Sequence, residues 1–116
     1  MKLNPDCVRD ILLTVEENTG YNKEMVYASP GQFSKLSKYD HDEIMYHLWQ
    51  CKDSGLIEGL ENIIGDFQVK KLTDAGHTLI VKIREDKTWK KILKCTVSSL
   101  PTLIATADKI YSAIPR

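Results

Sequence analysis

The pattern of residues 40–77 constrains the fold of this chain more than any other feature. Apolar residues with helical spacing run over Asp40–Asp53, and Ser54–Gly55 follows as a helix stop. Two short strand-like segments come next and meet at Gly65–Asp66, a dipeptide typical of hairpin turns. Thr73 then stands where an N-cap of a further helix is expected. The region is therefore predicted to fold as helix, two-stranded ribbon and helix.

Helix, ribbon and helix in this order build a winged helix-turn-helix. A first helix is expected to begin at Pro5, with Asn4 as its cap, and to end at Gly20 in a left-handed conformation. Residues 21–37 have no helical period, and they are predicted to form a strand at Gln32–Leu36 or a loop with at most one irregular turn. The predicted fold class is mainly α with a small β-hairpin (α+β), as a winged helix-turn-helix with an extra C-terminal helix.

The C-terminal third is predicted to be helical. The segment Arg84–Lys94 is expected to continue the preceding helix, and its basic residues are interpreted as a solvated face rather than a nucleic-acid patch. A last helix starts at Ser98–Pro101. It carries a heptad-like apolar seam, a predicted dimer interface formed by Leu100, Leu103, Ile104, Ala107, Tyr111 and Ile114. The alternative is packing against the first helix. The predicted organisation is a winged-helix domain at 1–95 and a packing or dimerisation element at 96–116.

Size and charge limit the classes of function. A chain of 116 residues fits one domain, and its longest apolar runs are too short for a membrane-spanning helix. No continuous apolar stretch follows Lys2, so no secretory signal is expected and the predicted location is the cytoplasm. The formal charge is −4 through Glu58 and +4 from Gly59 on. This acidic first half disfavours strong non-specific DNA binding, because phosphate neutralisation needs lysine and arginine.

Metal and catalytic chemistry are not expected. The three cysteines, Cys7, Cys51 and Cys95, lack paired spacing and are interpreted as free thiols on helices. His47 and Cys51 are one helical turn apart, but no second pair completes a metal site. There is no nucleophile–base pattern and no glycine-rich phosphate loop. The sequence therefore predicts no cofactor, no metal and no enzymatic activity.

The outward face of the Asp40–Asp53 helix is the predicted contact surface for DNA. Gln50 is suited to pair with adenine and Glu43 to accept from cytosine, while lysines neutralise phosphates. The predicted DNA-binding residues are Lys35, Lys38, Glu43, Tyr46, His47, Gln50, Lys52, Lys70 and Lys71. Carboxylates crowd the start of this helix and oppose that interpretation. The leading hypothesis is a homodimeric DNA-binding regulator.

A protein-interaction module is the alternative hypothesis. It would use Tyr46, Trp49 and the apolar tip Ile63–Ile64 of the ribbon. Exposed isoleucines at this tip would indicate contact with a partner protein. The other possibility for the tip is that both isoleucines tuck under the first helix.

Three blocks of the sequence carry a family resemblance. The opening Met1–Leu12 is similar to the start of an uncharacterised family of short bacterial and prophage-encoded proteins, a domain of unknown function. A second block, Ile44–Leu48 with Ser54–Ile57, and a third, Leu72–His77 with Ile83–Trp89, resemble the same family, and the third opens with a Leu-Thr-x-x-Gly-His motif. The resemblance implies a winged-helix fold and a mobile-element context. It implies no activity and no catalytic or binding residues.

Overall fold

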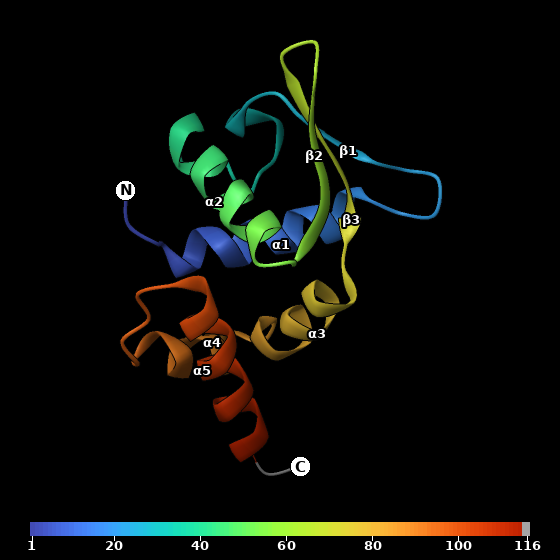
Figure 1. The fold of residues 1–116 in the computed structure, drawn as a ribbon. Helices are drawn as coiled ribbons and strands as arrows, with labels where there is room; N and C mark the ends of the chain where they lie inside the picture. Colours follow the sequence, from blue (N-terminus) through green and yellow to red (C-terminus); the bar gives the residue numbers. More distant parts are fainter. Residues whose placement is uncertain (115–116) are drawn as a thin grey trace.

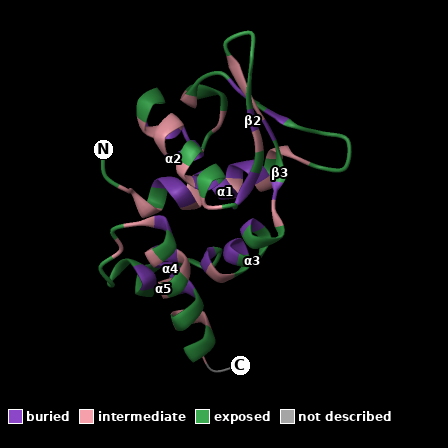
Figure 2. Ribbon diagram, in the orientation of Figure 1, coloured by how far each residue is buried: buried purple, intermediate pink, exposed green. Residues whose placement is uncertain are grey.

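The first helix forms where the sequence predicts it and runs through the middle of the molecule (Figure 1). In this computed structural model, which describes residues 1–114, α1 extends over Pro5–Asn18. The side chain of Asn4 accepts a hydrogen bond from the amide of Asp6 at 3.1 Å, and Pro5 takes a first-turn position, where no amide hydrogen is needed. Figure 2 shows that α1 is buried along much of its length. It is therefore the helix around which the other elements pack.

The end of α1 differs from the prediction for Gly20. The helix ends at Asn18, and Thr19 is already extended. The Asn18 side chain donates to the carbonyl of Thr14 at 2.8 Å, and the Thr19 hydroxyl donates to the carbonyl of Val15 at 2.7 Å. Because side chains satisfy these carbonyls, the helix ends without a left-handed residue. The predicted left-handed stop at Gly20 is wrong.

Three antiparallel strands form one sheet in the spatial order β1-β3-β2. They are β1 (Met25–Tyr27), β2 (Ile57–Ile63) and β3 (Asp66–Leu72). The strands β2 and β3 are the predicted hairpin, and Ile64–Gly65 is its two-residue turn. The hairpin projects away from the helices at one end of the molecule (Figure 1).

The strand β1 was not predicted from the sequence. Met25 lies opposite Val69 and Tyr27 opposite Phe67, so β1 covers the free edge of β3. Met25 and Tyr27 are buried and Val26 between them is exposed, which is the alternation expected of a half-buried strand. Three residues are too few for this period to be visible in the sequence.

The segment that joins β1 to α2 (His41–Asp53) contains a single short 3-10 helix, η1 (Pro30–Gln32). The Gln32 side chain accepts hydrogen bonds from the amides of Ala28 and Ser29 and holds this turn closed. The predicted strand at Gln32–Leu36 is therefore wrong, and the loop between β1 and α2 has a second turn at residues 34–38 where at most one irregular turn was expected.

The boundaries of α2 follow local signals. The Asp40 carboxylate accepts a hydrogen bond from the amide of Glu43 at 2.8 Å and caps the helix. Gly55 follows the helix with a φ of +73°, a conformation that side chains disfavour. On the inner side Ile44, Leu48 and Cys51 are fully buried, as predicted.

The expected single helix after Thr73 is two helices, α3 (Asp74–Ile83) and α4 (Asp86–Leu93). The guanidinium of Arg9 donates to the carbonyl of Ile83 at 2.8 Å and to that of Arg84 at 2.6 Å. These bonds replace the amide partners that a continuing helix would supply. The predicted continuation through Arg84–Lys94 is wrong, because a residue of α1 ends α3.

The last helix, α5 (Leu100–Ala113), begins where predicted, with the Ser99 side chain as its cap. It packs mainly on α3 and α4. The alternative prediction, that this helix packs mainly against the first helix, is therefore wrong. Three residues of the predicted dimer seam are buried within the chain, namely Leu100, Leu103 and Ala107. The half-buried members of the seam are Ile104, Tyr111 and Ile114. A second copy can therefore reach only part of the seam.

The predicted α+β class is confirmed, since helices dominate and the sheet is small. Figure 1 shows the sheet and α2 on one side of α1 and the helices α3, α4 and α5 on the other. Among residues 1–114 no helix has both the length and the apolar character needed to cross a membrane.

Candidate interaction surface

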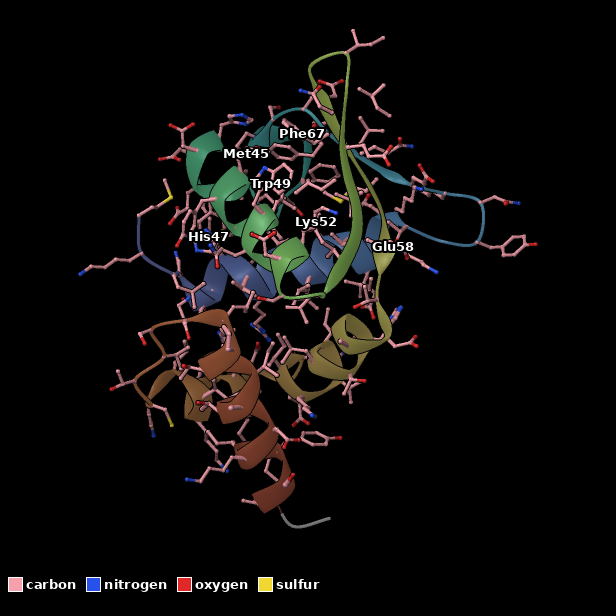
Figure 3. The ribbon with its side chains drawn as sticks, viewed as in Figure 1. Met45, His47, Trp49, Lys52, Glu58 and Phe67 are labelled. Atoms are coloured by element: carbon pink, nitrogen blue, oxygen red, sulfur yellow. The ribbon has the colours of Figure 1, made fainter. Side chains whose placement is uncertain are left out.

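One side of α2 faces the hairpin and carries two large apolar side chains. Met45 and Trp49 are four residues apart on one helical face, and Lys52 follows three residues later. Met45 is half-buried, whereas Trp49 keeps 42% of its surface exposed. Figure 3 shows Met45 and Trp49 on the side of α2 toward the hairpin, where Phe67 of β3 also lies. We call this region the α2–hairpin face, formed by Met45, Trp49, Lys52 and Phe67.

The face of α2 that was predicted to read DNA is turned inward. His47 is fully buried, and Glu43, Tyr46 and Gln50 are half-buried. The Glu43 carboxylate accepts a hydrogen bond from the side chain of Asn4 at 3.3 Å. The prediction that these four residues form a freely exposed face of α2 is wrong for His47, which is buried beneath the segment that precedes α1, and that segment also contacts Glu43.

Both ring nitrogens of His47 are engaged inside the fold. Nε2 accepts a hydrogen bond from the backbone amide of Asn4 at 2.8 Å, and Nδ1 lies 2.8 Å from the carbonyl oxygen of Glu43. An amide can only donate and a carbonyl can only accept, so the ring is neutral with its proton on Nδ1. His47 thus joins the start of α1 to α2, and neither nitrogen is left for a phosphate or a base.

The lysines that were predicted to neutralise phosphates do not gather on one surface. Lys35 and Lys38 form ion pairs with carboxylates of α1 at 2.5 and 3.1 Å. Lys71 pairs across the hairpin with a carboxylate of β2 at 3.6 Å. Lys52 lies near the end of α2 and Lys70 on β3. The structure therefore does not assemble the predicted set into one phosphate-binding site.

The hairpin tip is apolar and exposed. Ile64 is 99% exposed and Ile63 46% exposed, so the possibility that they tuck under the first helix is wrong. Ile64 has a φ of +51° and Gly65 a φ of +86°, which places both turn residues in the left-handed region. A β-branched residue rarely adopts this conformation. Val26 of β1, 47% exposed, lines a hollow with both isoleucines on the side of the sheet opposite to Phe67.

The electrostatic character of this region is acidic. Residues 41–66, which contain α2, β2 and the hairpin tip, hold six carboxylate side chains and a single lysine, Lys52, for a formal charge of −5. The carboxylates are those of Asp42, Glu43, Asp53, Glu58, Glu61 and Asp66. All of them except Glu43 and Asp66 are classed as exposed. The rest of β3 adds Lys70 and Lys71, so α2 and the whole hairpin (residues 41–72) have a formal charge of −3.

The comparisons with known proteins identify a family. The chain matches the family described as "Hypothetical protein (DUF2513)" over residues 2–100. The chain belongs to this family. It is also 31% identical over 102 residues to a protein of Haemophilus influenzae described as "Uncharacterized protein". The matched region covers 85% of this chain and 80% of that protein. No solved structure matches. These findings support the resemblance to an uncharacterised family that was drawn from the sequence.

The thiols within this family member differ in their surroundings. Cys7 and Cys51 are fully buried, and burial raises the pKa of the Cys51 thiol to about 12. Burial, reinforced by the Glu43 carboxylate, also raises the pKa of the Cys7 thiol well above its usual range. Both remain protonated and shielded, so neither is suited to nucleophilic chemistry. Cys95 is exposed. Within residues 1–114 no group of three or more His, Cys, Asp or Glu side chains is arranged to hold a metal ion.

The protein-interaction alternative drawn from the sequence included Trp49 but not its neighbour Met45. A signal was available, because α2 has apolar residues in two parallel lines. One line is Ile44, Leu48 and Cys51, and the other is Met45 and Trp49. The first line fills the core, whereas in the second Met45 packs against the core and Trp49 stays exposed. Two apolar lines on a short helix indicate a second contact surface.

Proposed function

We propose that this protein is a winged-helix module that binds a protein partner through the α2–hairpin face. The winged-helix assignment is supported by the element order α1, β1, α2, β2, β3 and by the pairing of β1 with β3. The 3-10 helix η1 stands where many winged helices have a full helix. A fold of this kind does not by itself specify a ligand. The choice of partner rests on the surface chemistry of α2 and the hairpin.

The charge of residues 41–66 is the observation that carries the proposal. Proteins gain much of their affinity for DNA by neutralising phosphates with lysine and arginine. This segment offers one lysine against six carboxylates, so bringing it to a duplex places like charges together. A partner with basic residues gains from the same carboxylates. The charge therefore favours a protein partner over DNA at this face.

The apolar side chains give the expected anchors. Tryptophan and methionine are enriched in protein interfaces, and Trp49 stands exposed next to Met45. Ile64 occupies a strained turn position that glycine or asparagine would fill at lower cost, and such strain points to a role outside folding. We therefore expect a linear segment whose apolar residues contact Met45 and Trp49 and whose lysines or arginines meet the surrounding carboxylates.

Selection from a random peptide library displayed on phage tests this function. Peptides that bind the protein are expected to carry lysine or arginine beside large apolar residues. A synthetic copy of a selected peptide should shift the emission of Trp49 to shorter wavelength and shield it from acrylamide, since the other tryptophan, Trp89, is already buried. Replacing Met45 with serine together with Trp49→Ala is expected to weaken binding by about 30-fold or more, the usual cost of losing a tryptophan anchor.

The matched control is Val81→Ser, which removes an exposed apolar side chain from α3. This variant should bind the peptide as the unaltered protein does. Equal binding by the control and the Met45/Trp49 variant, or selected peptides without basic residues, would contradict the proposal. If instead the unaltered protein binds duplex DNA and the Met45/Trp49 replacements abolish that binding, the α2–hairpin face is a DNA-binding surface. That result would support the hypothesis of a DNA-binding regulator.

Self-association through α5 is a separate proposal. The half-buried residues of the seam, among them Ile104 and Tyr111, would have to form the contact. Sedimentation of the protein should then show a dimer, and Ile104→Lys with Tyr111→Glu should give monomers, since charged side chains oppose burial. A sedimentation profile that the two replacements leave unaltered would refute the interface.

A further inference from the structure

A group of lysines lies along α4, the helix that follows the end of α3. Four lysines of α4 and its C-cap occupy the positions i, i+3, i+4 and i+7, which lie on one helical face. We call this group the lysine stripe, and it consists of Lys87, Lys90, Lys91 and Lys94. All four side chains are exposed. The stripe is thus a continuous basic surface on α4.

The opposite face of α4 holds the stripe in position. Trp89 is 3% exposed and Ile92 fully buried, and the indole nitrogen of Trp89 donates to the Asp6 carboxylate at 2.8 Å. At the start of the helix, Arg9 forms an ion pair with Asp86 at 2.8 Å. These contacts with α1 fix the orientation of α4. The lysines are therefore presented to solvent from a rigid support, on the side of α1 away from the hairpin (Figure 1).

The charges of the stripe are not neutralised within the chain. Six other cationic side chains form ion pairs, namely Arg9, Lys35, Lys38, Lys71, Lys82 and Arg84. In the described part of the chain, residues 1–114, no ion pair involves a lysine of the stripe. The acidic residues nearest in sequence are Glu85 and Asp86, and Asp86 is paired with Arg9. The stripe therefore keeps its full positive charge for an external anion.

We propose that the lysine stripe binds the phosphodiester backbone of duplex nucleic acid, independently of base sequence. From Lys87 to Lys94 the stripe spans about 10 Å along the helix axis. This is the rise of about three nucleotides of one strand, at about 3.4 Å each. Lysine is a point charge that neutralises phosphate without reading bases. The inference does not rest on the proposed function, because it uses another face of the molecule.

A membrane surface fits these observations less well. A helix that lies on a bilayer buries its apolar face among the lipid headgroups. In α4 the residues of that face, Trp89 and Ile92, are already packed inside the protein. Beside the lysines, Leu93 of α4 is 41% exposed, and a single apolar side chain is a small face for a bilayer, whereas a phosphate backbone matches the charges of the lysines.

A salt series on the intact protein tests the inference. Binding of a fluorescein-labelled random-sequence DNA duplex is followed by anisotropy between low and moderate NaCl. For four phosphate contacts, the logarithm of the association constant should fall with the logarithm of salt with a slope of about −3.6. In the variant Lys87→Gln/Lys91→Gln the slope should drop to about −1.8, because two contacts are lost. A double-stranded RNA of equal length should behave alike.

The control variant is Lys52→Gln/Lys70→Gln, which changes the net charge equally but lies on α2 and β3. Its slope should match that of the unaltered protein, and circular dichroism should show both variants folded. The proposal is overturned if no duplex binds at low salt or if the control lowers the slope as much as the stripe variant does. Binding to phosphatidylserine vesicles without binding to a duplex would also overturn it.

Discussion

Replacing Gly76 with alanine is expected to destabilise the protein by about 4 kcal/mol, at the upper end of the effects of single substitutions. Gly76 lies in the first turn of α3, where the helix crosses the start of β2. A Cβ at this position would lie 2.1 Å from the carbonyl oxygen of Leu56 and 3.4 Å from the Cβ of Leu72. The first neighbour is backbone, so a side-chain rotation cannot relieve the clash. The helix and the strand would have to separate.

Separation would also break the bonds that join these elements. The amide of Thr73 donates to the carbonyl of Leu56 at 3.0 Å, and the Thr73 hydroxyl donates to the carbonyl of Gly55 at 2.5 Å. The same hydroxyl accepts from the amide of Gly76 and caps α3. The Leu-Thr-x-x-Gly-His motif thus encodes a close crossing of helix and strand. Its glycine is required for space, since its φ lies outside the left-handed region.

Thermal unfolding followed by circular dichroism measures this effect. A loss of about 4 kcal/mol should lower the melting temperature by roughly 15–25 °C in a domain of this size. Gly31→Ala is the matched control, because Gly31 is exposed and a Cβ there meets nothing within 4 Å. That variant should change the stability by less than about 0.5 kcal/mol. Equal melting temperatures for the two variants would show that α3 does not cross β2 as described.

Local signals account for the parts of the fold that the sequence predicted. Asn4, Asp40, Thr73 and Ser99 each accept a hydrogen bond from an amide two or three residues later, so the starts of four helices can be read from single residues. The turn at Gly65 is equally local, since the backbone there needs a positive φ. Such signals depend on neighbours in the sequence alone.

The incorrect predictions have non-local causes. The helix after Thr73 ends at Ile83 because Arg9, far away in the sequence, takes its terminal carbonyls. The strand β1 exists because β3 offers it a free edge. Neither partner can be identified from periodicity. The same holds for α2, whose helical period shows two faces but not which of them the N-terminal segment will cover.

The candidate surfaces show the same limit. The sequence predicted contacts through α2 and the Ile63–Ile64 tip, and the structure exposes that tip and Trp49 of α2. The lysine stripe was visible as a basic run, but the contacts of Trp89 and Asp86 with α1 that hold its helix in place were not. The charge along the sequence therefore distinguished an acidic half of the chain from a basic half. It did not locate the α2–hairpin face or the lysine stripe.

Replacing His47 with alanine is expected to cost about 3 kcal/mol of stability, from the cavity and from the loss of an acceptor for the Asn4 amide. Urea denaturation should show this as a lower midpoint with an unchanged slope. Hydrogen exchange at the Asn4 amide should become faster, because this amide donates to Nε2. His77→Ala is the control, since His77 is exposed on α3, and it should leave the midpoint nearly unchanged.

The same variant separates a structural role of His47 from a DNA-contacting one. If the ring contacted a base or phosphate, as the sequence predicted, His47→Ala would weaken DNA binding while the stability stayed near that of the unaltered protein. Because the ring links the Asn4 amide to the Glu43 carbonyl, we expect His47→Ala to lower the stability and to leave DNA binding by the folded protein unchanged. The affinity of the folded variant for DNA should equal that of the unaltered protein. Any loss of binding should be proportional to the fraction of the variant that is unfolded. His47→Gln, which keeps a side-chain acceptor, should recover part of the stability, and no recovery would point to the cavity alone as the cause.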